Sequence, residues 1–124
     1  MRAKGRVFLI DDDGLILSML SRALRNEGYE VQTDASGEEV VSRVRSFHPD
    51  VVLLDIRLPG KSGMELLEEI VGSGMDTQVV MLTSDDTAET AIRAMKRGAV
   101  DYLTKPFNLD EVVLVIGKVI GNER

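Results

Sequence analysis

Residues 51–60 read VVLLDIRLPG, with four aliphatic residues directly before an aspartate. Aliphatic and β-branched residues without polar alternation are typical of a strand covered on both faces, as in a parallel sheet. Similar runs occur at residues 7–10 (VFLI), at residues 79–82 (VVML) and, more briefly, through Val100, Tyr102 and Leu103. Residues 29–33 alternate apolar and polar side chains, as an edge strand does. The sequence therefore predicts four covered strands and one edge strand.

Helical patterns separate these strands. Residues 109–120 carry apolar side chains with a period of about 3.6, and Asn108 is a suitable cap for that helix. Ser36 and Ser62 each precede a glutamate by three residues, which predicts capping boxes for two other helices. Because strand and helix alternate five times, we predict an α/β fold. It is a doubly wound, five-stranded parallel sheet in the flavodoxin-like order 2-1-3-4-5, with five helices.

The composition excludes several classes of protein. The 124 residues include 15 basic and 21 acidic ones, for a formal net charge of −6, with no cysteine and one histidine. An acidic chain lacks the basic face that phosphate contacts require, so direct nucleic-acid binding is not expected. Disulfides, thiolate sites and multi-histidine metal sites are excluded. Without a signal-peptide pattern or a run approaching the roughly 20 apolar residues of a membrane span, we expect one cytoplasmic domain over residues 1–124.

Charged and hydroxyl side chains follow the ends of the predicted strands. Asp11 and Asp12 follow the first strand, Asp55 the third, Thr83 the fourth and Lys105 the fifth. These strand ends share one edge of a parallel sheet, which is where such sheets bind ligands. Carboxylates in close proximity repel one another unless a cation or proton intervenes. Ligands that are all oxygen favour a hard cation, so we predict Mg²⁺, with Mn²⁺ as the alternative.

A phosphoryl group would complete such a site. Mg²⁺ would bridge one of its oxygens, Lys105 would pair with another, and the Thr83 hydroxyl would hold the rest together with backbone N–H groups. Phosphoryl transfer also needs a nucleophile. Asp55 stands alone at the end of the central strand, which leaves Asp11 and Asp12 to share the metal. A lone aspartate after a strand is usually a turn residue, so the prediction depends on the convergence of four strand ends.

The chain resembles the receiver domains of response regulators in two-component signalling. Each motif is weak alone, but their order and spacing are specific, and the resemblance covers essentially the whole chain. The residues that carry it are FLIDDD at 8–13, VLLDIRLPG at 52–60, MLTS at 81–84 and GAVDYLTKPF at 98–107.

The resemblance implies a role for each residue of the site. Asp55 would accept the phosphoryl group. Asp12, Asp55 and the backbone carbonyl of Arg57 would bind Mg²⁺ directly, and Asp11 would act largely through a metal-bound water. Lys105 would neutralise the phosphoryl group, and the peptide bond between Lys105 and Pro106 is expected to be cis.

The resemblance also implies a conformational switch. Thr83 would move toward the phosphoryl group, and the Tyr102 ring would turn inward to fill the vacated space. The surface made by the fourth helix, the fifth strand and the fifth helix would then change, as a population shift driven by a local charge.

The implied partners follow from that chemistry. A sensor histidine kinase or a phosphotransfer protein would supply the phosphoryl group, and an output domain outside this chain or a downstream protein would receive the signal. A phosphorylation-dependent homodimer through the changed surface is a further expectation. The domain would catalyse its own Mg²⁺-dependent phosphorylation and dephosphorylation, without turning over an external substrate as an enzyme does.

Three other readings compete with this one. The DDDG run at residues 11–14 fits the opening motif of haloacid-dehalogenase-type phosphatases, with Asp11 as the nucleophile. That reading leaves Asp55 unexplained and places the acidic pair at 85–86 before Lys105 instead of after it. A flavodoxin-like electron carrier would set a flavin phosphate against three repelling aspartates. An interaction module with an inactive pocket would not bind Mg²⁺.

Overall fold

The computed structural model describes residues 4–121, which form five strands and five helices in strict alternation. The strands make one parallel sheet in the order β2-β1-β3-β4-β5, so the predicted fold class and strand order are confirmed. In chain order the elements are β1 (Arg6–Ile10), α1 (Gly14–Asn26), β2 (Glu30–Asp34), α2 (Val40–Phe47), β3 (Val51–Leu54), α3 (Gly63–Gly72), β4 (Gln78–Thr83), α4 (Ala88–Lys96), β5 (Asp101–Thr104) and α5 (Leu109–Ile120).

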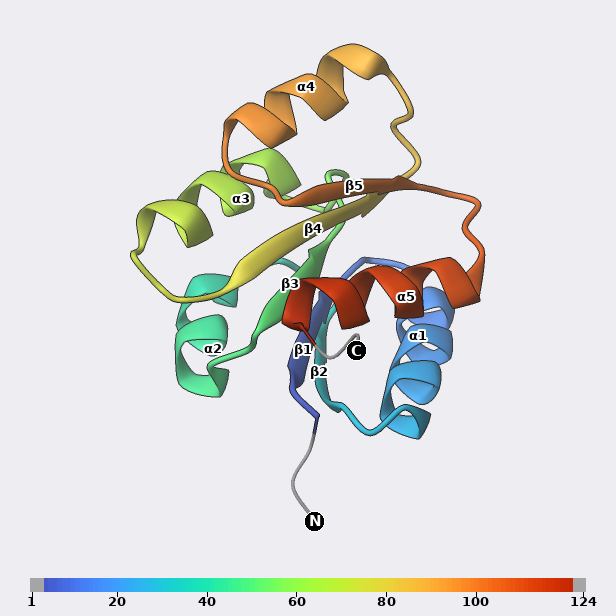
Figure 1. The fold of residues 1–124 in the computed structure, drawn as a ribbon. Coiled ribbons are helices and arrows are strands. Elements are labelled where there is room, and N and C mark those ends of the chain that lie inside the picture. Colours follow the sequence, from blue (N-terminus) through green and yellow to red (C-terminus); the bar gives the residue numbers. More distant parts are fainter. Residues whose placement is uncertain (1–3, 122–124) are drawn as a thin grey trace.

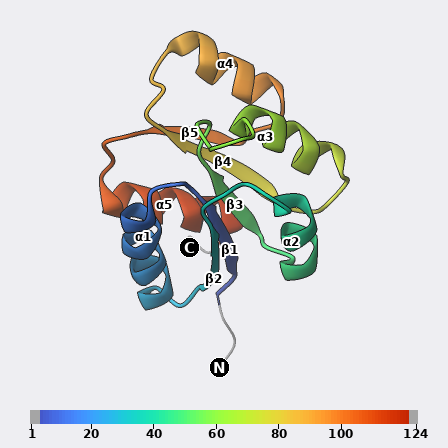
Figure 2. The ribbon, with the colours of Figure 1, turned by 180° about the vertical axis from the view of Figure 1, so that it is seen from behind.

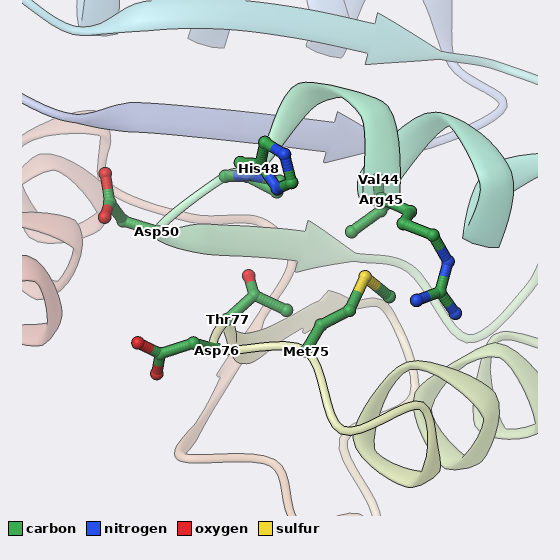
Figure 3. A pocket seen from close by; sticks show the side chains of 8 residues that line it. Val44, Arg45, His48, Asp50, Met75, Asp76 and Thr77 are labelled. Atoms are coloured by element: carbon green, nitrogen blue, oxygen red, sulfur yellow. The ribbon is translucent and has the colours of Figure 1, made fainter.

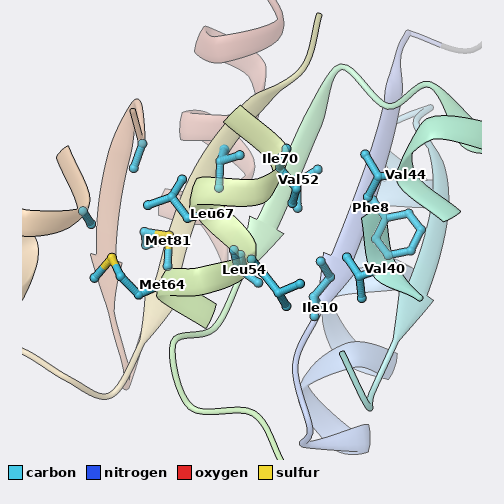
Figure 4. Packing of buried hydrophobic residues seen from close by; sticks show 14 of the residues in the cluster. Phe8, Ile10, Val40, Val44, Val52, Leu54, Met64, Leu67, Ile70 and Met81 are labelled. Carbon is cyan, nitrogen blue, oxygen red and sulfur yellow. The ribbon is translucent and has the colours of Figure 1, made fainter. Parts of the chain in front are cut away.

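Helices cover both faces of the sheet, with α1 and α5 on one face and α2, α3 and α4 on the other (Figures 1 and 2). Strand β3 explains why its sequence shows no polar alternation. Val52 and Leu54 pack toward α2 and α3 in one apolar cluster (Figure 4), while Val51 and Leu53 pack with residues of α1 and α5 in the other. All four side chains are buried, because both faces of this central strand are covered.

Polar side chains cap the helices that begin near the carboxyl edge of the sheet. Ser62 accepts the N–H of Met64 at the start of α3, and Asn108 accepts two N–H groups at the start of α5, so both residues are caps as predicted. Within the described residues, no side-chain bond from Glu65 completes the predicted capping box at Ser62. Asp13 caps α1 by accepting the N–H groups of Leu15 and Ile16. A cap of this kind satisfies backbone donors that have no partner within the helix. Asp13, the third aspartate of the acidic run, is therefore a structural residue that caps a helix.

The predicted cap at Ser36 is wrong. Helix α2 begins four residues later, at Val40, and its N-cap residue is Glu39, which has a φ of 53° and makes no side-chain cap bond. The carboxylate of Asp34 accepts the backbone N–H and the hydroxyl of Ser36 and the N–H of Gly37. These three bonds hold the segment in a turn around Asp34, so Ser36 cannot serve as the first residue of a helix.

The helices are short. Among the described residues the longest helix, α1, has 13 residues, whereas a membrane span requires roughly 20. Within residues 4–121, none is both long and apolar enough to cross a bilayer.

Candidate functional site

Three carboxylates meet at the carboxyl edge of the sheet. Strands β1 and β3 are neighbours, with Ile10 opposite Leu54. Asp11 and Asp55 follow directly after these two residues, and Asp12 is the next residue after Asp11. One oxygen from each of Asp11, Asp12 and Asp55 lies within 4.8 Å of the others. Asp11 and Asp55 are each only 4% exposed, whereas Asp12 is exposed. The predicted residues therefore form one cluster that is open to solvent on the side of Asp12.

Lys105, in the segment after β5, reaches across the sheet edge to this cluster. Its Nζ donates to Asp11 Oδ2 at 2.6 Å and to Asp55 Oδ2 at 2.9 Å. The peptide bond between Lys105 and Pro106 is cis, as predicted. One positive charge thus faces three carboxylates, and the cluster keeps an excess of negative charge.

Burial, hydrogen bonds and neighbouring charges shift the pKa values of Asp11 and Lys105. Burial raises the pKa of Asp11, and the charge of Asp55 adds to the rise, against opposing bonds from Lys105 and from the N–H of Asp13. Burial lowers the pKa of Lys105, but its bonds to the two carboxylates and their charges outweigh this, so the net shift is upward. An additional cation would relieve the repulsion among the carboxylates. The all-oxygen donor set fits a hard divalent cation such as Mg²⁺.

The segment after β3 is held closely against α3. The N–H of Arg57 donates to Asp55 Oδ1 at 3.1 Å, and the N–H of Gly63 donates to Ile56 O at 2.7 Å. A Cβ at Gly63 would clash with the backbone oxygen of Asp55, so no other residue fits there without moving the segment after β3. Sequence reasoning gave Gly63 no such role, because a close backbone approach between two segments leaves no local motif.

Thr83 and Tyr102 are both linked to the segment between β4 and α4. Thr83 is fully buried, and its Oγ1 accepts the N–H of Asp85 at 3.3 Å. The Tyr102 hydroxyl donates to the backbone oxygen of Asp85 at 2.5 Å. Burial, together with the charge of Asp85, raises the pKa of Tyr102 to about 12, so the phenol is a proton donor at neutral pH. The two predicted switch residues are thus joined through one loop residue.

A separate hollow of about 380 Å³ lies at the opposite, amino-terminal edge of the sheet (Figure 3). Its lining includes His48, Asp50 and Asp76, and the single histidine is exposed at the end of α2. Among residues 4–121, the only group of three acidic or imidazole side chains close enough to share a metal ion is the one at Asp11, Asp12 and Asp55. The candidate site is therefore at the carboxyl edge.

Comparisons with known proteins show which family the chain resembles. The family model of the response regulator receiver domain matches residues 7–117. Regulatory protein AtoC of Escherichia coli is 36% identical over 120 residues, which are 97% of this chain and 26% of AtoC. The DNA-binding transcriptional regulator NtrC of Salmonella typhimurium is 38% identical over 119 residues, 96% of this chain and 25% of NtrC. The chain spans about a quarter of the length of these two relatives.

The chain is also similar to solved structures of receiver domains. A CheY-like response regulator receiver domain protein from Methanospirillum hungatei has a TM-score of 0.89 and 28% identity, covering 98% of this chain and 96% of that one. The phosphatase alternative, with Asp11 as the nucleophile, gains no support, because the matched family is a receiver family.

Proposed function

Because the chain belongs to the response regulator receiver domain family, we propose that it is a phosphorylation-controlled switch whose phosphoryl acceptor is Asp55. The observation that carries this proposal is the position of the Asp55 carboxylate. It is buried at the end of the central strand, 2.9 Å from the Lys105 ammonium and beside two further aspartates. A carboxylate nucleophile beside one fixed cation, with two further carboxylates that could hold a divalent cation, suits the transfer of an anionic phosphoryl group.

The proposed reaction moves a phosphoryl group from a phosphohistidine to Asp55. The N–P bond of the donor breaks as an O–P bond forms at a carboxylate oxygen of Asp55. Lys105 holds that carboxylate in place and compensates the charge of the transferred group. Asp11 accepts both the Lys105 ammonium and the N–H of Asp13, which fixes the orientation of its carboxylate.

Mg²⁺ is the proposed cofactor, with Mn²⁺ as the alternative. Asp12, Asp55 and the backbone carbonyl of Arg57 would hold it directly and Asp11 through water, and when bound it would neutralise charge on the phosphoryl oxygens. The exposed Asp12 gives the site an open side for a hydrated ion. The proximity of three carboxylate oxygens, within 4.8 Å, supports this assignment.

The proposed output is a change at the surface of α4, β5 and α5. Thr83 and Tyr102 would respond to the phosphoryl group, and the changed surface would act on an output domain, a downstream protein or a second copy of the chain. The relatives AtoC and NtrC, which are regulators about four times as long, support an output domain beyond the receiver. A sensor histidine kinase or phosphotransfer protein would be the donor, and we expect the reaction to take place in the cytoplasm, without contact to a membrane.

Intact-mass spectrometry tests the acceptor directly. Wild type, Asp55→Asn and the control Asp34→Asn are incubated with acetyl phosphate, with and without Mg²⁺. Asp34 is a useful control because it is also a buried aspartate at the end of a strand, but it is bonded to Arg43 and lies outside the acidic cluster. We expect one phosphoryl group in wild type and in Asp34→Asn, dependent on Mg²⁺, and none in Asp55→Asn.

Two outcomes would overturn the assignment. An adduct retained in Asp55→Asn but lost in Asp11→Asn would indicate the phosphatase-type nucleophile. If wild type shows no adduct, a titration with beryllofluoride and Mg²⁺ distinguishes rapid hydrolysis from an inactive pocket, because beryllofluoride mimics the phosphoryl group without being hydrolysed. Absence of both the adduct and beryllofluoride binding would contradict the proposed switch.

A further inference from the structure

A groove of about 490 Å³ lies between α1 and β2, which is the outermost strand on its side of the sheet. Helix α1 packs beside this strand (Figures 1 and 2). Apart from Gly14 and Leu17, the lining consists of side chains that can donate hydrogen bonds, namely Ser18, Ser21, Arg22, Arg25 and Thr33. The described residues that line the groove include no acidic side chain. A groove of this volume, with donors and cations only, fits a small anion.

The hydroxyl of Ser21 is the first feature that indicates a ligand. Ser21 is only 7% exposed, and among residues 4–121 its Oγ has no hydrogen-bond partner. A serine in a helix can bond back to the carbonyl one turn earlier, which here belongs to Leu17, but Ser21 does not. Buried polar groups are usually bonded, so one without a partner calls for an explanation. A ligand oxygen in the groove would accept the hydrogen bond that the chain leaves unmade.

The two arginines of the groove are the second feature. Within the described part of the chain, neither Arg22 nor Arg25 has a carboxylate at ion-pair distance, whereas Arg6 and Arg43 each have one. Arg25 donates one N–H to the backbone oxygen of Val31 at 3.1 Å, which directs its guanidinium toward β2. Residues three apart are neighbours on a helix surface. The groove therefore carries two adjacent guanidinium groups, whose planar donors match phosphate oxygens.

We propose that this groove binds the diphosphate group of a small phosphorylated molecule. Each guanidinium would hold one phosphate, and the Ser21 hydroxyl would donate to an oxygen of the ligand. Asp34, the residue after Thr33, does not compete for these arginines, because its carboxylate is bonded to Arg43 of α2. The groove shares no residue with the acidic cluster or with Lys105. The inference therefore goes beyond the proposed switch and does not depend on it.

The test is a titration with sodium pyrophosphate in metal-free buffer of low ionic strength, because salt screens exposed charges. Isothermal titration calorimetry compares wild type with Arg22→Ala, Ser21→Ala and the control Arg45→Ala. Arg45 is also an exposed arginine without an ion pair among the described residues, but it lies on α2, outside the groove. We expect the first two variants to bind about tenfold more weakly, the factor that corresponds to one hydrogen bond to a charged group. Arg45→Ala should bind as wild type does.

Two-dimensional ¹H–¹⁵N NMR during the same titration locates the bound anion. We expect the backbone signals of Ser18, Ser21 and Thr33 to shift, while those of Asp55 and Lys105 stay in place. Asp55→Asn should bind pyrophosphate as wild type does, so a failure of the proposed switch would leave this site intact. A response centred on Asp55 and Lys105 would place the anion at the acceptor site and overturn the inference.

The serine variant separates a specific site from general attraction between charges. Ser21→Ala keeps the net charge, and alanine is the best helix former, so α1 should remain intact. If Ser21→Ala binds as wild type does while Arg22→Ala and Arg45→Ala lose affinity equally, pyrophosphate responds only to the charge of the protein and the inference is wrong. Absence of binding to wild type would also overturn it.

Discussion

Asp34 and Asp55 are two buried aspartates at the same edge of the sheet with opposite local environments. Asp34 is the last residue of β2, Asp55 follows β3, and these strands lie on either side of β1. Each carboxylate is bonded to one basic side chain, Arg43 at 2.6 Å for Asp34 and Lys105 at 2.9 Å for Asp55. Burial and the presence of a cationic partner therefore do not distinguish them.

The other groups around each carboxylate make the difference. Asp34 also accepts the N–H and hydroxyl of Ser36 and the N–H of Gly37. Burial raises the pKa of Asp34, but these donors together with Arg43 outweigh it, so the net shift is downward. Among residues 4–121, Asp55 accepts a backbone N–H only from Arg57, and it shares Lys105 with Asp11. Charge balance, rather than burial, separates the carboxylate that stabilises a turn from the one that we propose as the phosphoryl acceptor.

The largest expected effect is on stability, and it has opposite signs at the two positions. Asp34→Asn removes a charge that four donors satisfy, and the new amide places N–H groups against N–H donors. We expect the free energy of unfolding to fall by about 2 kcal/mol. Asp55→Asn removes one of three mutually repelling charges and leaves Asp11 to pair with Lys105. In metal-free buffer we expect the free energy of unfolding of Asp55→Asn to rise by up to about 1 kcal/mol.

Urea unfolding in the presence of a chelator measures both values, and Glu89→Ala provides a surface control without an expected effect. Equal losses of stability in the two asparagine variants would contradict this expectation. In that case the two carboxylates would be equally well paired in the folded protein, and the argument for an unbalanced site at Asp55 would no longer hold.

The same two regions show what the sequence could and could not predict. The acidic edge was predictable because each aspartate follows a strand of recognisable type, and strand order in a doubly wound sheet brings those ends together. Asp12, Asp55 and Lys105 therefore could be placed in one cluster before any coordinates were known. The cluster depends only on the order of the strands in the sheet, and the pattern of covered strands predicts that order.

The Asp34 turn was not predictable in the same way. Ser36 and Glu39 have the spacing of a capping box, and that local signal is sound by itself. The turn around the Asp34 carboxylate prevents the cap at Ser36. Arg43 from the following helix holds that carboxylate in place. A local motif cannot show which of two competing acceptors a backbone N–H will choose. The link between Thr83, Asp85 and Tyr102 was missed for the same reason, since it joins residues from two strands and a loop.

The next largest effect is on metal affinity, and it should be confined to the acidic cluster. Asp12→Ala removes the exposed carboxylate that we propose as a direct Mg²⁺ ligand. We expect the affinity for Mg²⁺ to fall at least tenfold, or about 1.4 kcal/mol in binding free energy. Proteins hold this ion with few ligands, so the loss of one carboxylate removes a large part of the binding energy. Asp34→Asn should bind Mg²⁺ as wild type does. Isothermal titration calorimetry gives both constants, and equal losses in the two variants would mean that Mg²⁺ responds to overall charge rather than to the cluster.

The smallest effect is the pH dependence of the difference between wild type and Asp34→Asn. The pKa of Asp34 lies below the ordinary value of an aspartate, so as pH falls the unfolded chain binds this proton before the folded one does. Stability rises with pH wherever the unfolded state binds more protons. The contribution of Asp34 is therefore complete above about pH 4 and is lost as pH falls through the lowered value. Urea unfolding at a series of pH values should show a constant difference near neutrality that narrows below about pH 4. A difference that stays constant in acid would mean that Asp34 stabilises the turn through its shape and not through its charge. The contrast with the unbalanced charge at Asp55 would then have a steric rather than an electrostatic origin.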